Sequence, residues 1–284
     1  MNKITFYILI SFLLHSCANH GQLKFLAKLP KDLKENSGIA YFSGDTAWFV
    51  ADSGNSDDIY QVNFEGKLVK KLEVKNAKNR DWEELTEDKK GNLYIGNFGN
   101  NYNDRDDLVI YKLPNPEIEP GKKIDAQKIE FRFPEQKDFP PKKKDLIYDA
   151  EAMFHYKGFL YIFTKDRANP FTGRTALYKV PDTEGNYDAK LISSLNICDN
   201  WDFCRITAAD ISNDGTTVVL LGYGKLWKFT DFSGDDFLSG KIKEYELGLR
   251  TQLESVTFLN DRELLLSDEE NKKGGGNLYS FSID

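Results

Sequence analysis

The sequence of 284 residues predicts an all-β fold built from repeated units. It contains 14 tyrosines and 20 phenylalanines, residue types that favour strands, and long stretches with the apolar periodicity of a helix are hard to find. One apolar pattern also returns five times along the chain. Such a repeat is typical of architectures in which neighbouring units stack to bury a shared core.

Each repeat opens with a segment in which a polar or acidic start leads into small and apolar residues. The five segments are ENSGIAY (35–41), RDWEELT (80–86), YDAEAMF (148–154), RITAADI (205–211) and TQLESVT (251–257). Their starts lie 45, 68, 57 and 46 residues apart. These spacings match the period of a β-propeller blade, about 40–50 residues, if two repeats carry insertions.

Three further strands complete each predicted unit. The second strands are TAWFVADSG, NLYIGNFGN, FLYIFTKDR, TTVVLLGYG and ELLLSDEE. The third strands are DIYQVN, LVIYKLP, ALYKVP, KLWKFTD and NLYSFSI. The fourth strands, each of which precedes the next repeat, are LKFLAKLP, KLVKKLEV, KIEFRFP, KLISSLNI and KIKEYEL. Turn residues such as Lys90-Gly91-Asn92 separate the strands.

The order of these strands predicts how the ring closes. The last unit ends at its third strand, while LKFLAKLP stands alone before the first repeat. Pairing the two buries both sheet edges, which an open array would expose. We therefore predict a five-bladed propeller of four-stranded blades, closed by an N-terminal outer strand, with six blades as the alternative. The charged, proline-rich stretches 114–128 and 134–146 are expected to be loop insertions.

The first residues predict export rather than structure. Lys3 precedes an apolar run of eleven residues, 4–14, which is too short to span a bilayer as a helix and reads as a signal peptide. Leu14-His15-Ser16-Cys17 resembles a bacterial lipobox, which implies cleavage before Cys17 and lipid on its sulfur. The alternative is an ordinary signal peptide with an incidental cysteine. The expected organisation is a signal peptide (1–16), a lipidated tether (17–22) and one propeller domain (23–284), anchored to a membrane of the bacterial cell envelope.

Two cysteines and the net charge indicate which cross-link, metal site and partner to expect. Cys198 and Cys204 are expected to form a short-loop disulfide, because an exported protein meets oxidising conditions; two free thiols are the alternative. A zinc site is not expected there, since a second cysteine pair or a nearby histidine is missing. The net charge of −7 argues against nucleic acid as a partner.

In a propeller the first strand of each blade lines the central channel, so the starts of the five segments should meet around one axis. Aligned, these positions are Ser37, Glu83, Glu151, Thr207 and Glu254. Beside them fall Asn36, Asp81, Asp149 and Gln252. Buried carboxylates repel one another and cost several kcal/mol each unless they are paired. A positive group is therefore expected at this end of the channel.

Two kinds of positive group fit this position. Calcium takes carboxylate, amide and water oxygens at flexible geometry. The basic side chains that could take its place are Arg80, Lys165, Arg167 and Arg205. A third interpretation is compatible with both: the acids accept hydrogen bonds from backbone amides of the adjacent blade and so lock the blades together.

The ends of the second strands face the same end of the channel and are the expected ligand-binding positions. They are Asp52, Asn97, Lys165 and Asp268, with Arg105 and Arg167 close by in sequence. Gly54 and Gly99 follow two of these strands and would let the backbone approach the axis closely. Arg105 is expected either to bind an anion or to lock the loop. Ordinary Asn- and Gly-rich turn chemistry is the alternative for these loops.

ENSGIAY…WFVADSGN, DWEELT…NLYIGNFGNN…R and YDAEAMF…LYIFTKDR together resemble the SdiA-regulated (YjiK-like) family of exported propellers. With RITAADIS, the resemblance covers roughly residues 30–284. It implies a five-bladed propeller with calcium near the channel, held among Asp81, Glu83, Asp149, Glu151 and Glu254. Ser37 and Thr207 interrupt the acidic ring, which leaves the ligand set open.

Three functions follow from these residues. The first is a lipid-anchored binding module that uses calcium to hold a small anionic or carbohydrate ligand. Trp48, Trp82, Tyr102 and Trp201 could stack on a sugar, although the two tryptophans in strands are better core candidates. The second is a calcium-dependent hydrolase of phosphoesters or lactones; the third is an assembly scaffold at the outer membrane. The sequence leans against catalysis, because a catalytic triad would have to use His155 and the chain has no Gly-x-Ser-x-Gly elbow.

Overall fold

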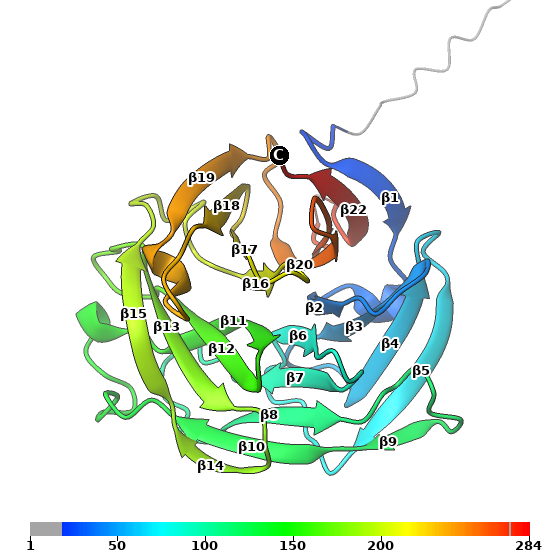
Figure 1. Ribbon diagram of the computed structural model, residues 1–284, viewed down its shortest axis with the longest axis horizontal. Coiled ribbons are helices and arrows are strands. Elements are labelled where there is room, and N and C mark those ends of the chain that lie inside the picture. The colour runs from blue at the N-terminus through cyan, green and yellow to red at the C-terminus, as the bar shows by residue number, and fades with distance from the viewer. Residues whose placement is uncertain (1–18, 273) are drawn as a thin grey trace, which may run out of the picture.

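The computed structural model describes residues 19–272 and 274–284. Its strands form five separate β-sheets arranged in a ring, as Figure 1 shows. Within the described residues the fold is therefore a five-bladed β-propeller, and this prediction is confirmed. The predicted signal peptide and Cys17 lie outside the described residues. None of the described helices has the length and apolar character needed to cross a membrane.

The innermost strand of every blade comes from one of the five repeated segments. These strands are β2 (Asn36–Ala40), β6 (Glu84–Glu87), β11 (Asp149–Tyr156), β16 (Ala208–Ile211) and β20 (Leu253–Asn260). Each contacts the next around the ring, and β20 contacts β2. The residues at which these strands begin therefore meet at one end of the channel, and those at which they end meet at the other.

The second and third strands follow antiparallel to the first. The second strands are β3 (Thr46–Ala51), β7 (Leu93–Asn97), β12 (Phe159–Lys165), β17 (Thr217–Leu221) and β21 (Glu263–Asp268). The third strands are β4 (Asp58–Asn63), β8 (Leu108–Leu113), β13 (Arg174–Pro181), β18 (Lys225–Thr230) and β22 (Asn277–Ser282). Nine of the ten fall within the segments predicted for them, and β13 begins two residues before its predicted segment, ALYKVP.

The fourth strands include the one that closes the ring. Four of them are β5 (Leu68–Lys75), β10 (Gln127–Arg132), β15 (Lys190–Asn196) and β19 (Lys241–Glu246). The fifth is β1 (Lys24–Lys28), which pairs antiparallel with β22, Lys24 opposite Ser280 and Lys28 opposite Asn277. The N-terminal strand thus completes the C-terminal blade, as predicted, and the last sheet keeps no unpaired third strand.

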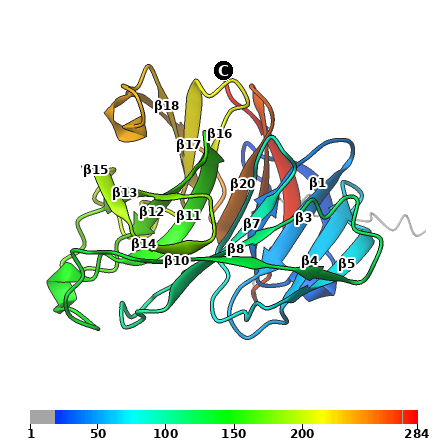
Figure 2. The same ribbon diagram turned by 60° about the horizontal axis from the view of Figure 1, so that its bottom comes forward.

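Two blades carry a fifth strand that was not predicted. β9 (Lys123–Asp125) pairs in parallel with β5, and β14 (Gly185–Asp188) pairs in parallel with β10. Figure 2 shows β10 beside β8 across the tilted ring. The stretch 114–128 is therefore not only loop, because Ile124 is buried in the core between the first two blades. The three short 3₁₀ helices are η1 (Lys31–Leu33), η2 (Lys143–Asp145) and η3 (Phe237–Ser239).

The hydrophobic core lies between neighbouring blades. One cluster joins Trp48 of the first blade to Trp82 and Leu85 of the second, and both tryptophans are fully buried. These two rings are therefore core residues and cannot stack on a sugar. Gly38 allows the inner strands to approach, since a Cβ there would lie 2.5 Å from the backbone nitrogen of Leu85.

Candidate functional site

The end of the channel at which the inner strands begin is lined by carboxylates, and we call it the acidic mouth. The predicted ring acids that gather there are Asp81, Glu83, Asp149, Glu151 and Glu254. The carboxyl group of Glu83 is within electrostatic reach of Asp81, Asp149 and Glu151, while Lys165 reaches both Glu151 and Glu254. The circular fold thus brings these side chains together from three blades.

Gly99, which follows β7, lets two of these carboxylates converge. A Cβ at this position would lie 2.3 Å from Glu83 Oε1 and 2.4 Å from Asp81 Oδ2. Contacts this short require a shift, so a side chain here would displace both acids. The two carboxylates consequently pack side by side against the bare Cα of Gly99.

Basic side chains neutralise the part of the mouth that belongs to the third blade. Lys165 Nζ lies 3.0 Å from Glu151 Oε1, and the Lys165 side chain is only 3% exposed. Arg167 contacts both acids of β11, with Nη2 2.9 Å from Glu151 Oε1 and Nε 2.5 Å from Asp149 Oδ2. Two of the four basic residues considered in place of calcium therefore bind ring acids directly.

The other two basic residues lie elsewhere. Arg80 pairs with Asp107. The guanidinium of Arg205 stacks against two rings, 4.3 Å from the centroid of Trp201 and 4.8 Å from that of Tyr223. Neither is placed among the ring acids by these contacts.

The part of the mouth opposite the third blade is dominated by negative charge. Burial, followed by repulsion from Glu35, Asp81 and Glu254, raises the pKa of Asp52 to about 7. Burial, followed by repulsion from Glu254 and Asp52, raises the pKa of Glu269 to about 9, with Lys165 opposing the shift. At neutral pH these groups hold protons that isolated carboxyl groups would release.

Two of the ring acids, Glu83 and Asp149, also have raised pKa values. Burial raises the pKa of Glu83 well above its usual range, and Glu151 and Asp81 raise it further. Burial and Glu151 raise the pKa of Asp149 to about 7, against the attraction of Arg167. A cation entering the mouth would displace these protons and relieve the repulsion.

Sequence reasoning did not single out Glu35 and Glu269. Glu35 is the first residue of the first repeated segment, and Asn55 Nδ2 bridges it to Asp52 at 3.1 and 3.2 Å. Glu269 directly follows Asp268 at the end of β21. Both could have been predicted as site residues from the sequence, because each lies at an end of a strand that faces the mouth.

Three of the predicted ligand-binding residues have their polar groups engaged by the protein itself. Asn97 Oδ1 accepts hydrogen bonds from the backbone nitrogens of residues 80 and 81. Arg105 Nη1 donates to the carbonyl of Gly99 at 2.7 Å, which locks this loop. Asp268 accepts hydrogen bonds from Thr251, Tyr279 and the backbone of Asn277. These contacts position the mouth, whereas Asp52, Lys165 and Arg167 line it.

Side chains of the inner strands also tie adjacent blades together, as the third interpretation expected. Ser37 Oγ donates to the carbonyl of Trp82 at 2.6 Å, and Thr207 Oγ1 donates to that of Leu253 at 2.7 Å. Asp149 Oδ1 accepts a hydrogen bond from the backbone of Asn100 at 2.7 Å. The polar residues that interrupt the acidic ring are thus links between blades.

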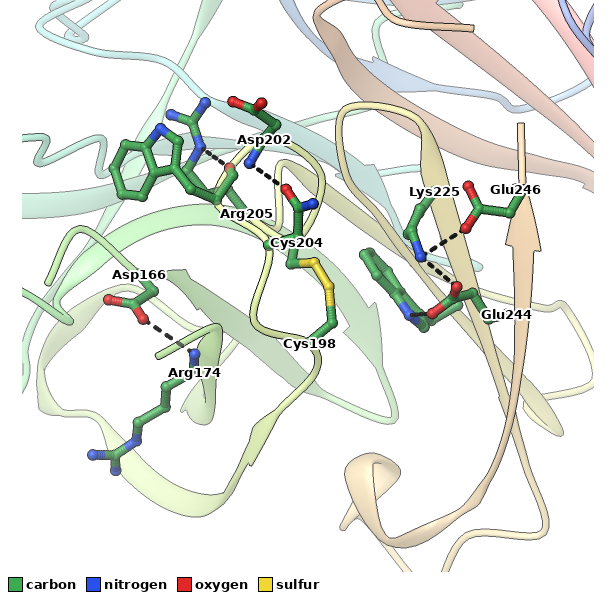
Figure 3. Close-up of a disulfide and its surroundings, with 12 residues drawn as sticks. Asp166, Arg174, Cys198, Asp202, Cys204, Arg205, Lys225, Glu244 and Glu246 are labelled. Atoms are coloured by element: carbon green, nitrogen blue, oxygen red, sulfur yellow. Dashed lines mark hydrogen bonds and ion pairs between the residues drawn. A yellow bond between two sulfur atoms is a disulfide. The ribbon is translucent and has the colours of Figure 1, made fainter. Parts of the chain in front are cut away.

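A disulfide holds an aromatic loop close to the same mouth. Cys198 and Cys204 are bonded, with Cα atoms 5.7 Å apart, and Figure 3 shows Arg205 beside them. The loop carries Trp201, which is 42% exposed, and Arg205 joins it to Tyr223. Lys165 Nζ lies 5.4 Å from the centroid of Tyr223, so the aromatic stack continues to the ring acids.

Solved structures similar to this chain include two sugar-related enzymes. The PQQ-bound aldose sugar dehydrogenase from Streptomyces coelicolor superposes with a TM-score of 0.55 at 12% identity, over 93% of this chain and 98% of that chain. The gluconolactonase from Xanthomonas campestris gives a TM-score of 0.46 at 10% identity, over 88% of this chain and 72% of that chain. Neither a protein-family model nor a curated protein matches the sequence. At 12% identity the likeness to the dehydrogenase is one of fold alone.

Proposed function

We propose that this protein is a ligand-binding module of the bacterial cell envelope that holds a calcium ion at the acidic mouth. The observation that carries the proposal is the pair of carboxylates, Asp81 and Glu83, that converge at Gly99. Both belong to a mouth whose remaining acids repel one another.

The donor atoms suit calcium. They are carboxylate oxygens from separate blades, and calcium accepts such ligands at variable geometry. Asp81, Glu83, Glu254 and Asp52 are the residues that would hold the ion, because Asp149 and Glu151 already bind Arg167 and Lys165. When bound, calcium supplies a positive charge that can polarise an oxygen of an anionic or carbohydrate ligand. The missing side chain at Gly99 lets Asp81 and Glu83 come together.

The envelope location rests on the sequence. The apolar run before Cys17 predicts export, and Cys17 itself predicts lipid attachment. Membership of the SdiA-regulated family is part of this proposal, supported by the repeated segments. Metabolic labelling with a fatty acid tests it: the wild-type protein should incorporate label, and Cys17→Ser should not. An unlabelled wild-type protein would contradict the lipid anchor and leave the calcium proposal standing.

Thermal unfolding tests the calcium site. Calcium at one hundred times its Kd, bound only to the folded protein, adds about 2.7 kcal/mol to the free energy of unfolding. For a domain of this size Tm should then rise by roughly 5–10 °C, and chelator should reverse the rise. The double variant Asp81→Asn, Glu83→Gln should lose this response.

The matched control is Glu65→Gln, which removes one carboxylate from an exposed turn. Glu65 pairs with Lys67 at the surface, and both side chains are more than 70% exposed. This variant should respond to calcium like the wild type. An equal response of the double variant would exclude the proposed ligands, and no response of the wild type would support the blade-linking interpretation alone.

A calcium-dependent hydrolase is the second candidate. Its supporting observation is Asp52, whose pKa of about 7 suits a general base at neutral pH. In this alternative Asp81, Glu83 and Glu254 would hold the ion, and Asp52 would not bind it but would take a proton from the water that attacks a lactone or phosphoester. Asp52→Asn should then abolish turnover in a screen of such substrates. Calcium-dependent ligand binding without turnover by the wild type would favour the binding module.

A further inference from the structure

The opposite end of the channel holds a cavity of about 770 Å³, which we call the far mouth. It is bordered by the residues at which the inner strands end, including Glu87 of β6, Tyr156 of β11 and Ile211 of β16. Its wall also includes three residues that sequence reasoning did not join: Asp88, His155 and Asp182.

These three side chains form a compact group. One ligand atom from each lies within 4.8 Å of the others. His155 Nε2 is 2.9 Å from Asp182 Oδ2, and both side chains are mostly buried, 12% and 17% exposed. Asp88 comes from the turn after β6, His155 from the end of β11, and Asp182 from just after β13, so the group joins two blades.

Surrounding contacts hold each member in place. Asp88 accepts hydrogen bonds from Asn92 Nδ2 and Tyr94 Oη, at 2.7 and 2.9 Å. Although burial works against it, these bonds keep the pKa of Asp88 below its usual value, so the carboxylate is ionised. The ring of His155 stacks on Tyr94 with centroids 5.3 Å apart. Lys112 Nζ bonds the backbone carbonyl of Asp182 at 2.9 Å rather than its carboxylate.

We propose that Asp88, His155 and Asp182 form a binding site for a divalent transition-metal ion of the zinc type. One imidazole and two carboxylates are a ligand set that such ions prefer, and hydrogen bonds from outer groups are typical of ligands held ready for a metal. A tetrahedral ion about 2.1 Å from each atom would set them roughly 3.4 Å apart. His155 Nε2 and Asp182 Oδ2, now 2.9 Å apart, would therefore separate slightly, and Asp88 would move toward them. The cavity leaves a fourth position open to water or a ligand.

The proton balance of binding is simple. In the metal-free protein His155 Nε2 and Asp182 Oδ2 lie in hydrogen-bond contact at 2.9 Å. The incoming ion takes the lone pair of Nε2 and an oxygen of each carboxylate. The imidazole binds in its neutral form, so a proton carried by Nε2 moves to Nδ1 through solvent, or leaves to solvent where Nδ1 already carries one. Neither oxidation nor a further reactant is needed.

The two mouths should therefore select different ions. The acidic mouth offers oxygen atoms, whereas the far mouth adds an imidazole nitrogen. Oxygen-only sites suit calcium, and imidazole favours zinc over calcium. Because of this difference the two sites can be tested separately, and a negative result for one proposed site does not affect the proposal for the other.

Isothermal titration of the purified protein with Zn²⁺ tests the proposal. We expect one ion to bind per chain, and the binding to be at least about tenfold weaker in His155→Phe, which removes the nitrogen but keeps a ring on Tyr94. Asp182→Asn should weaken it similarly while keeping a hydrogen bond to His155. Titration with Co²⁺ should give the visible absorption of a low-symmetry site, and His155→Phe should lose it.

The control uses the other histidine in the described part of the chain. His20 stacks on Phe25, with centroids 5.1 Å apart, in a different blade. His20→Phe should bind Zn²⁺ like the wild type, as should the Asp81→Asn, Glu83→Gln variant. Absence of Zn²⁺ binding up to the millimolar range in the wild type would overturn the proposal. So would binding that survives both His155→Phe and Asp182→Asn, with unchanged Tm showing that these variants are folded.

Discussion

Replacing Lys165 with methionine tests whether buried charge pairing holds the acidic mouth together. Lys165 ends β12 and lies 3.0 Å from Glu151 Oε1, with each side chain 3% exposed. Methionine fills the same volume without the charge. The substitution therefore leaves Glu151 buried with Arg167 as its remaining partner, 2.9 Å away.

The expected cost follows from this geometry. Removing one partner of a buried ion pair costs about 3–5 kcal/mol, because the other charge stays buried and uncompensated. Arg167 still contacts Glu151, so we expect the lower end, about 3 kcal/mol. Single domains have a total stability of only about 5–15 kcal/mol. With an m-value near 3 kcal/mol/M, the midpoint of urea unfolding should fall by about 1 M.

The loss should also depend on pH. Without Lys165, Glu83 loses an attraction that favours its ionised form, so its pKa in the folded state should rise further. Folded carboxyl groups with raised pKa values keep protons that the unfolded chain releases, which lowers stability as pH increases. The difference between variant and wild type should consequently be largest at pH 8 and shrink toward pH 5.

Lys225→Met is the matched control. Lys225 also contacts two carboxylates, Glu244 at 2.5 Å and Glu246 at 2.7 Å, but Glu246 is 65% exposed (Figure 3). Such a surface pair contributes about 0–1 kcal/mol. If Lys165→Met costs no more than Lys225→Met in urea at pH 8, charge pairing does not hold the mouth together.

Three further predictions follow. The folded pKa values of about 7 for Asp52 and about 9 for Glu269 exceed the reference values of 3.8 and 4.5, so the free energy of unfolding should decrease between pH 5 and pH 9. Scanning calorimetry in chelator measures this, and a Tm that stays constant or rises over this range would contradict it. The double variant Cys198→Ser, Cys204→Ser should lower the free energy of unfolding by about 2–3 kcal/mol, because a short disulfide removes that much loop entropy from the unfolded chain. If reductant leaves the Tm of the wild type unchanged, this expectation is wrong. Gly99→Ala should displace the acids beside it and abolish the calcium-dependent rise in Tm. Gly54→Ala has open space around its Cβ position but a φ of +87°, so it should lower Tm through backbone strain and still keep the calcium-dependent rise.

The fold could be predicted because its signal is local and repeated. Each blade supplies the same alternation of apolar residues and turns, and five copies reinforce one another. The extra strands β9 and β14 could not be predicted this way. They are three and four residues long, and β9 forms because Ile124 can be buried against the neighbouring strand. Their pairing depends on tertiary contacts that no local pattern encodes.

The acidic mouth was partly predictable for the same reason. Alignment of the repeats gathered acids such as Glu83 and Glu254 at one end of the channel, and the structure places them there. It could not tell which polar groups serve the loops, as Arg105 does, because this depends on side-chain directions. The far mouth was missed because Asp88, His155 and Asp182 occupy unrelated positions in their repeats.

The unpaired edge of each inner strand explains why a channel contains so many acids. β6, β11, β16 and β20 are terminal strands of their sheets, so some of their backbone amides need acceptors outside the sheet. Asp210 Oδ2 accepts the amide of Phe258 at 2.8 Å, and Glu84 Oε2 accepts that of Ala209 at 3.2 Å. Acids engaged in this way are structural, whatever their charge. Glu83 differs, because its carboxylate converges with that of Asp81 at Gly99, and we propose that this convergence separates a ligand for an ion from a link between blades.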